Sequence, residues 1–258
     1  MTETNSTGWR PASDMWFSAS LEAIALAVTE VPQVGQSMPV AFMRTDAGWR
    51  AMAVFSSGNG RNCFLTHDGH WRGHYVPALL RAYPFTLLGE RTDKQLKLWP
   101  NVTPEPLGDG VEPFLEDGQP TEHIRKTMSF LTLVHADIAK ADEAIKLLDN
   151  AGVMRPWQPA GSDRCLKLSG NAVYAVGSDR LAALPDTLFL KLREIGALPW
   201  IYAHLHSLHF AHLLAQPDDA SWSEAIKSFG TNAVSDGRTE NASDVLEAIG
   251  YDLGDFEL

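Results

Sequence analysis

The chain has 258 residues, a formal net charge of -11 at pH 7 and a hydrophobic content of 45%. This length can bury a full hydrophobic core, and it fits one large domain with an appendage better than two independent domains. Ten carboxylates and two cationic side chains fall in residues 217–258, so most of the negative charge lies in this acidic tail. Because binding to nucleic acid needs a basic surface, the composition argues against nucleic acid as a partner.

The two cysteines, Cys63 and Cys165, are far apart and lie in no CxxC motif. They predict two free thiols in a reducing compartment. The first ten residues lack the basic start of a secretory signal, and no segment approaches the roughly 18 continuous apolar residues of a membrane span. We therefore expect a cytoplasmic protein without a membrane span, in an oligomeric state that the sequence leaves open.

The first half of the chain is expected to form a small antiparallel meander. Residues 1–15 are polar and are expected to be irregular, whereas apolar residues spaced by three or four predict a short helix over 16–28. Alternating apolar residues separated by turn-forming residues then predict strands. The strands are expected at 38–43, 49–55, 62–66, 85–88 and 95–99, with a helix between His74 and Pro84.

The second half is expected to be mostly helical. Residues 100–120 are rich in proline and predict a surface loop. Apolar residues that recur every three or four positions predict the longest helix over 121–150. A hairpin over 164–176 and helices over 185–195 and 200–214 should follow.

These elements predict an α+β fold, in which an antiparallel sheet of meander and hairpins packs against three or four helices. We expect this domain to cover residues 1–216. The acidic tail, residues 217–258, is either partly disordered or a segment that docks on a partner.

Five stretches of the chain share their order and spacing with a known family. They are the strand Pro39–Phe42; Gly69-His70-Trp71 with Tyr75–Phe85; Phe114–Thr121; Ala182–Asp186; and Ile201–Leu205 with Ser207-Leu208. Over residues 30 to 214 the chain thereby resembles the SapC family, named for surface-layer protein loci. The start of the chain and the acidic tail depart from the family pattern. A peptide-transporter permease carries the same label, but it is a membrane protein and this sequence has no membrane span.

The resemblance implies no established reaction and no cofactor. It implies an accessory role linked to surface-layer export or to TonB-dependent uptake and halogenase-like systems. Because the chain shows no complete catalytic constellation, we expect a non-catalytic protein that binds a ligand or a partner. The expected partner is a protein or a small anionic ligand.

Aromatic and cationic side chains gather near the strand-to-helix junction around residues 71–85. The rings either fill the space between sheet and helix or line a cleft. In such a cleft arginine would form a bidentate ion pair with the carboxylate of an anionic ligand. His204 lies in another family-like stretch, and it is expected as a hydrogen-bonded core residue or as a ligand contact. The candidate ligand-binding residues are Trp71, Arg72, Tyr75, Arg81, Tyr83, Tyr202 and His204.

Histidines form a second pattern with possible chemistry, at positions 67, 70 and 74 and again between 204 and 212. On a helix, His209 and His212 share a face, and His204 lies two turns from His212 on one face. The alternative function is therefore a metal-dependent enzyme that uses His204, His209 and His212. No HExxH motif is present and no carboxylate falls within 202–214, so structural or solvent-facing histidines remain the main interpretation. A GxSxG elbow and a phosphate loop are also missing.

Overall fold

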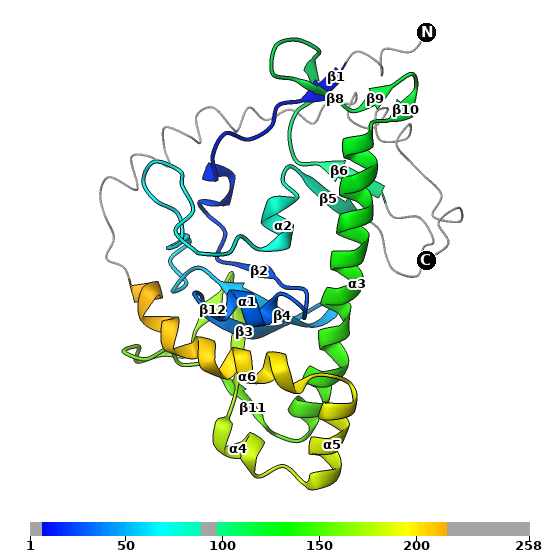
Figure 1. Cartoon of the computed structure of the whole chain (residues 1–258). Helices are drawn as coiled ribbons and strands as arrows, with labels where there is room; N and C mark the ends of the chain where they lie inside the picture. The colour runs from blue at the N-terminus through cyan, green and yellow to red at the C-terminus, as the bar shows by residue number, and fades with distance from the viewer. Residues whose placement is uncertain (1–6, 89–96, 216–258) are drawn as a thin grey trace. The chain divides into compact units, whose positions relative to one another are not determined.

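The computed structural model describes residues 7–88 and 97–215. Contacts between Cα atoms divide the chain into two compact units, with boundaries after Ser13, Leu80 and Leu133. Most helices and strands of both units are labelled in Figure 1. Antiparallel sheets and helices confirm the predicted α+β class. The acidic tail lies outside the described residues, so its order and docking stay predictions, as does a single domain over 1–216.

The larger unit, which comprises residues 14–80 and 134–215 of the described chain, is built on an antiparallel six-stranded sheet. Its centre is the predicted hairpin of β3 (Val40–Thr45) and β4 (Gly48–Val54). Gly48 turns this hairpin with φ 104°, a conformation that favours glycine. The strand order is β11-β13-β3-β4-β2, with β12 paired to β13; the outer strands are β2 (Ala23–Ala25), β11 (Met154–Pro156), β12 (Lys167–Leu168) and β13 (Asn171–Val176).

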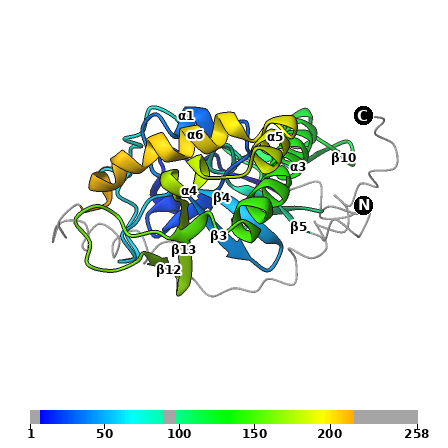
Figure 2. The same ribbon diagram turned by 90° about the horizontal axis from the view of Figure 1, so that it is seen from below.

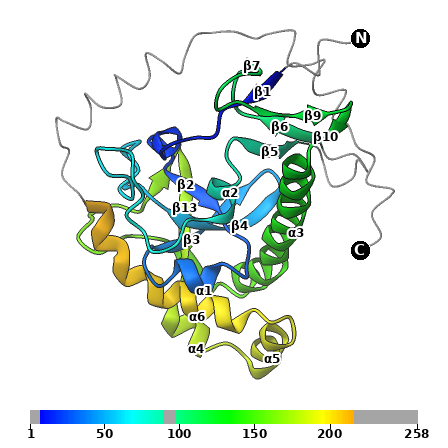
Figure 3. The same ribbon diagram turned by 45° about the horizontal axis from the view of Figure 1, so that its top comes forward.

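Two helices lie along one face of this sheet, α1 (Val31–Val34) and α6 (Leu198–Ser207), as Figures 2 and 3 show. Gly35 allows their close approach, because a Cβ atom there would lie 3.0 Å from the carbonyl oxygen of Ala203. Further helices of the unit include α4 (Ser178–Ala182), α5 (Asp186–Glu194), the 3-10 helix η3 (Leu208–Ala215) and the second part of α3 (Glu122–Asn150).

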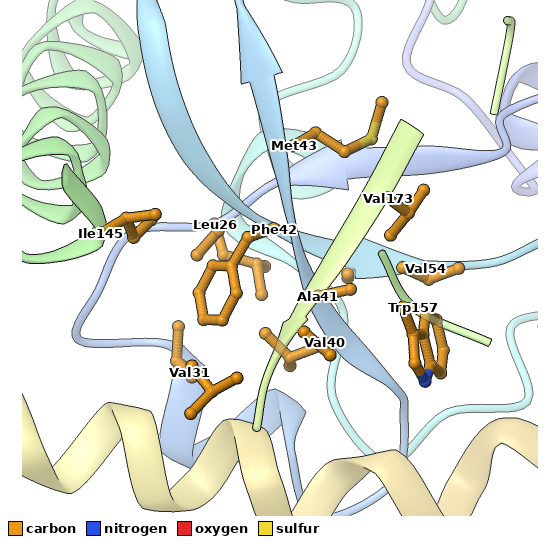
Figure 4. Packing of buried hydrophobic residues seen from close by; sticks show 14 of the residues in the cluster. Leu26, Val31, Val40, Ala41, Phe42, Met43, Val54, Ile145, Trp157 and Val173 are labelled. Carbon is orange, nitrogen blue, oxygen red and sulfur yellow. The ribbon is translucent and has the colours of Figure 1, made fainter. Parts of the chain in front are cut away.

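The core of the larger unit forms between the sheet and these helices. Alternation along β3 puts Val40 and Phe42 on the side of Val31 and α6, whereas Met43 points to the other side (Figure 4). Phe42 is fully buried, and its ring centroid lies 6.0 Å from that of Trp200 on α6. Residues 40–43 are all buried, so both faces of β3 are covered, in line with the continuous apolar stretch in the sequence.

The smaller unit comprises residues 7–13, 81–88 and 97–133 of the described chain. Trp9 lies at the centre of this unit and is 2% exposed. Its ring centroid is 5.2 Å from that of Phe114 and 5.0 Å from that of Phe85. The strands are β1 (Thr7–Trp9), which pairs with β7 (Glu105–Pro106) and β8 (Glu112–Pro113); β5 (Phe85–Leu88), which pairs with β6 (Lys97–Pro100); and β9 (Leu115–Glu116), which pairs with β10 (Gln119–Pro120).

Several predicted elements are confirmed, namely the strand at 85–88, the strand expected at 95–99 and found as β6 over its described part, the long helix α3, the hairpin of β12 and β13, and α5. The predictions for residues 1–15 and 100–120 were incomplete, because β1, β7 and β8 pair with one another. Such short strands pair through the backbone of segments far apart in sequence, which local patterns do not encode.

The predicted helix over 16–28 was wrong. The chain forms only a 3-10 turn at η2 (Trp16–Ser18) and then β2, in which Ile24 pairs with Ala53 of β4. The apolar spacing was helical, but pairing at the sheet edge satisfies the backbone of residues 23–25 instead.

The predicted strand over 62–66 is reduced to one bridge between Leu65 and Trp71. Asn62 explains the difference, because its Oδ1 accepts a hydrogen bond from the Phe64 N–H at 2.9 Å and so forms a turn. The helix before Pro84 is also shorter than predicted, covering only α2 (Ala78–Arg81), and the helix over 200–214 changes to 3-10 geometry after Ser207.

Candidate functional site

A pocket of about 290 Å³ opens in the larger unit. Four segments form it: the turn after α1, residues 63–64, the loop 72–74 and η3. Its polar lining comes from Gln36, Ser37, Arg72 and His74, and its apolar lining from Phe64, Phe210 and Leu213, with Cys63 in the wall. The pocket therefore has both a polar and an apolar part to its lining.

The loop that carries Arg72 and His74 is fixed by Trp71. The indole N–H of Trp71 donates a hydrogen bond to the Tyr75 carbonyl oxygen at 2.9 Å, and its ring contacts Phe55 edge-on at 5.4 Å. Gly73 fits beneath this ring, since a Cβ atom there would lie 2.6 Å from Trp71 Nε1. Trp71 is half-buried while Arg72 and His74 are exposed, so the loop presents both polar side chains at the pocket.

Tyr75 does not line the pocket and instead binds a buried carboxylate. Its hydroxyl group donates to the carboxylate of Glu30 at 3.0 Å, and Glu30 is only 7% exposed. The same carboxylate accepts hydrogen bonds from the N–H groups of Ala78 at 2.6 Å and Ala27 at 3.1 Å. A buried carboxylate needs such donors, so Tyr75 and Glu30 anchor the start of α2.

Two polar groups of the pocket lack partners within the described part of the chain. The guanidinium group of Arg72 makes no hydrogen bond or ion pair there, and the buried hydroxyl group of Ser37 has no hydrogen-bond partner. Burial raises the pKa of the Cys63 thiol, against the opposing effect of Arg61 and Arg72. The wall thus offers a cation, an unsatisfied hydroxyl group and a neutral thiol.

His204 lies in the core, with 0% of its surface exposed. Nδ1 donates to the Val40 carbonyl oxygen at 2.7 Å, and Nε2 accepts the Val176 N–H at 3.1 Å. Burial lowers its pKa to about 4, although the bond to Val40 acts the other way. Because both ring nitrogens are engaged with the backbone, His204 has no lone pair free for a ligand or metal.

The other histidines of this region do not join it. His209 and His212 are exposed, and their Nδ1 atoms lie 2.5 Å and 2.8 Å from the carbonyl oxygens of His206 and His209. Among the residues that the structure describes, no three His, Cys, Asp or Glu side chains form a group that could hold a metal ion. The three histidines do lie on helical turns as the spacing predicted, but His204 points into the core while His209 and His212 are exposed.

The remaining candidates are dispersed. Tyr202 is 51% exposed on α6. Arg81 and Tyr83 belong to the smaller unit, where the Arg81 guanidinium lies 5.5 Å from the centre of the Phe130 ring. Of the seven predicted residues, only Arg72 lines the pocket. Sequence reasoning missed Ser37 and Phe210 as site residues, because nothing in their local sequence marks them.

The fold is α+β, and the larger unit carries a small pocket lined by both polar and apolar residues. Residues 3–213 match the SapC family, and the chain belongs to this family. The match includes the start of the chain, which was expected to depart from the family pattern. Comparison with curated proteins and with solved structures gives no significant match. No helix in the described ranges has the length and apolar content needed to cross a membrane.

Proposed function

We propose that this SapC protein is a non-catalytic binding protein that holds a small anionic ligand in the pocket beside Arg72. One observation carries the proposal: the guanidinium group of Arg72, unpaired within the described residues, lines the same pocket as the buried hydroxyl group of Ser37. A buried hydroxyl group such as that of Ser37 normally has a partner. An anionic ligand would supply an acceptor for it and for the exposed guanidinium group of Arg72.

The arrangement of the wall favours binding over turnover. A nucleophilic thiol or hydroxyl group needs a base within hydrogen-bonding distance. No hydrogen bond joins His74 to Ser37, and the thiol of Cys63 faces the carbonyl oxygen of Leu214 at 3.7 Å. Since burial raises the pKa of this thiol, it stays protonated near neutral pH.

The proposed cellular role rests on the family resemblance. We place the protein in the cytoplasm as an accessory to surface-layer export or to TonB-dependent uptake and halogenase-like systems, as the family resemblance implies. The acidic residues 217–258 are the segment proposed to contact a protein partner. Deleting them should abolish capture of that partner and leave the pocket intact, whereas unchanged capture would contradict docking by the tail.

Calorimetry on the full chain tests the anion site. Small anions should bind, and Arg72→Ala should abolish this binding while leaving the circular dichroism spectrum unchanged, because Arg72 is exposed. Arg44→Ala is the matched control, since Arg44 is an exposed arginine at another cavity of the same unit. Equal loss in both variants, or no binding by any anion, would contradict the proposal.

A further inference from the structure

The backbone around the pocket offers few donors. Five N–H groups of the lining residues already donate to acceptors at 2.8 to 3.3 Å, and they belong to Gln36, Ser37, Cys63, Phe64 and Arg72. Protein sites for phosphate depend on several free backbone N–H groups that point at the anion. Among the lining residues outside η3, only the N–H groups of Gly73 and His74 donate to no acceptor in the described chain, so the pocket is less suited to a phosphate group than to a ligand with fewer oxygen atoms.

The other available donors are side chains. Arg72 is the only arginine or lysine among the described lining residues, and the Ser37 hydroxyl group can add one hydrogen bond. A guanidinium group presents parallel N–H donors that match the two oxygens of a carboxylate, and the pair carries balanced single charges. A dianion would leave its second charge without a cationic partner, which is costly in a partly apolar site.

The opposite lining is apolar. Phe64 is 4% exposed and its ring centroid lies 5.9 Å from that of Trp71, so its position is fixed by packing. Phe210 and Leu213, on η3, are half-buried and complete this side. A volume of about 290 Å³ is at the lower end of the range for ligand pockets, which fits a small molecule.

We infer that the ligand is a small monocarboxylate with a short apolar body. Its carboxylate binds Arg72 and the Ser37 hydroxyl group, and its apolar body packs on Phe64, Phe210 and Leu213. This assignment of ligand class rests on the proposed function and deepens it. It concerns the chemistry that the pocket recognises, with no covalent step.

Cys63 provides a reporter of occupancy within the pocket wall. In a Cys165→Ser background, which removes the exposed second cysteine, the rate of Cys63 modification by methyl methanethiosulfonate is measured. Phenylacetate, butyrate and inorganic phosphate are compared at equal ionic strength. At ten times its dissociation constant a carboxylate should slow modification about tenfold, because about one tenth of the sites remain free.

Matched variants and calorimetry with the same three anions separate the outcomes. Arg72→Ala should abolish protection by carboxylate, Arg72→Lys should weaken it, and Arg44→Ala should leave it unchanged. Protection and binding by phosphate but by neither carboxylate, still dependent on Arg72, would overturn the ligand class and leave the anion site standing. If no anion binds or protects, both the ligand class and the proposed function fail.

Discussion

The imidazole ring of His204 completes the strand ladder at Val40. β13 pairs with β3 at Val173–Met43 and Tyr174–Phe42, and the same register would place Val176 opposite Val40. There the histidine ring stands between the strands, donating to the Val40 carbonyl oxygen and accepting the Val176 N–H. A side chain of α6 thus replaces one step of backbone pairing in the buried centre of the larger unit.

The ladder position of His204 predicts a loss of stability in mild acid. Its pKa falls from 6.5 to about 4 on folding, mainly through burial, so the unfolded chain binds more protons between these values. The contribution of His204 to the free energy of unfolding is fully present above pH 6.5 and falls as the pH drops towards 4. The loss should reach about 3 kcal/mol, measured by urea unfolding between pH 7.5 and 4.5.

Burial also lowers the pKa of His135, so the comparison needs a control. His204→Gln should reduce the slope in this pH range, and His135→Gln should leave the His204 contribution in place. Nitrogen NMR should show His204 as the neutral tautomer protonated at Nδ1 at pH 6. A charged His204 ring at pH 6 would contradict the argument.

Ser207 makes the neighbouring contact. Its hydroxyl group accepts the Val40 N–H at 2.9 Å and donates to the His204 carbonyl oxygen at 2.6 Å, fully buried. Ser207→Ala leaves the Val40 N–H without a partner, which should cost about 1–3 kcal/mol in the free energy of unfolding. Ser129→Ala, at an exposed helical serine, should cost much less. Equal losses in the two variants would disprove a specific role for Ser207.

The pair of Glu30 and Tyr75 predicts an energetic coupling. Tyr75→Phe removes one donor from the buried carboxylate, and Glu30→Gln removes the charge that three donors face. A double-mutant cycle by urea unfolding should give a coupling of about 1 kcal/mol or more. Additive effects of the two substitutions would show that the hydrogen bond contributes little.

Gly73 links the Trp71 loop to the pocket. In Gly73→Ala the new Cβ atom would lie 2.6 Å from Trp71 Nε1 and 2.9 Å from the end of Met38. Overpacking of this kind costs about 1–3 kcal/mol, and we also expect weaker anion binding because Arg72 moves with the loop. Gly108→Ala is the control, since a Cβ atom at that position would have no neighbour among the described residues within 4 Å. Unchanged stability and binding in Gly73→Ala would contradict the close fit.

Metal analysis tests the enzyme alternative. Because the Nε2 atom of His204 is occupied by the Val176 N–H, we expect that His204, His209 and His212 bind no stoichiometric metal. Elemental analysis of the untagged protein before and after chelation measures this directly. Stoichiometric zinc that is lost in His209→Ala with His212→Ala would instead support the metal-dependent enzyme.

The sequence alone determined the elements whose patterns are local. Two apolar stretches on either side of the turn Asp46-Ala47-Gly48 predicted the β3–β4 hairpin, and recurrence every three or four residues predicted α3. Five stretches that share the order and spacing of a known family identified the SapC family. These predictions are correct because residues on the same face of a helix or strand share one environment.

Only the tertiary structure decided what depends on distant partners. Residues 23–25 form a strand because an edge of β4 is available, and the pocket exists because Ser37, Cys63, Arg72 and Phe210 meet from four separate segments. His204 was expected either in the core or at a ligand. In the structure both of its ring nitrogens form hydrogen bonds with the backbone of β3 and β13. Hydrogen-bond partners brought together by folding carry no periodic signal in the chain, so pattern reading cannot supply them.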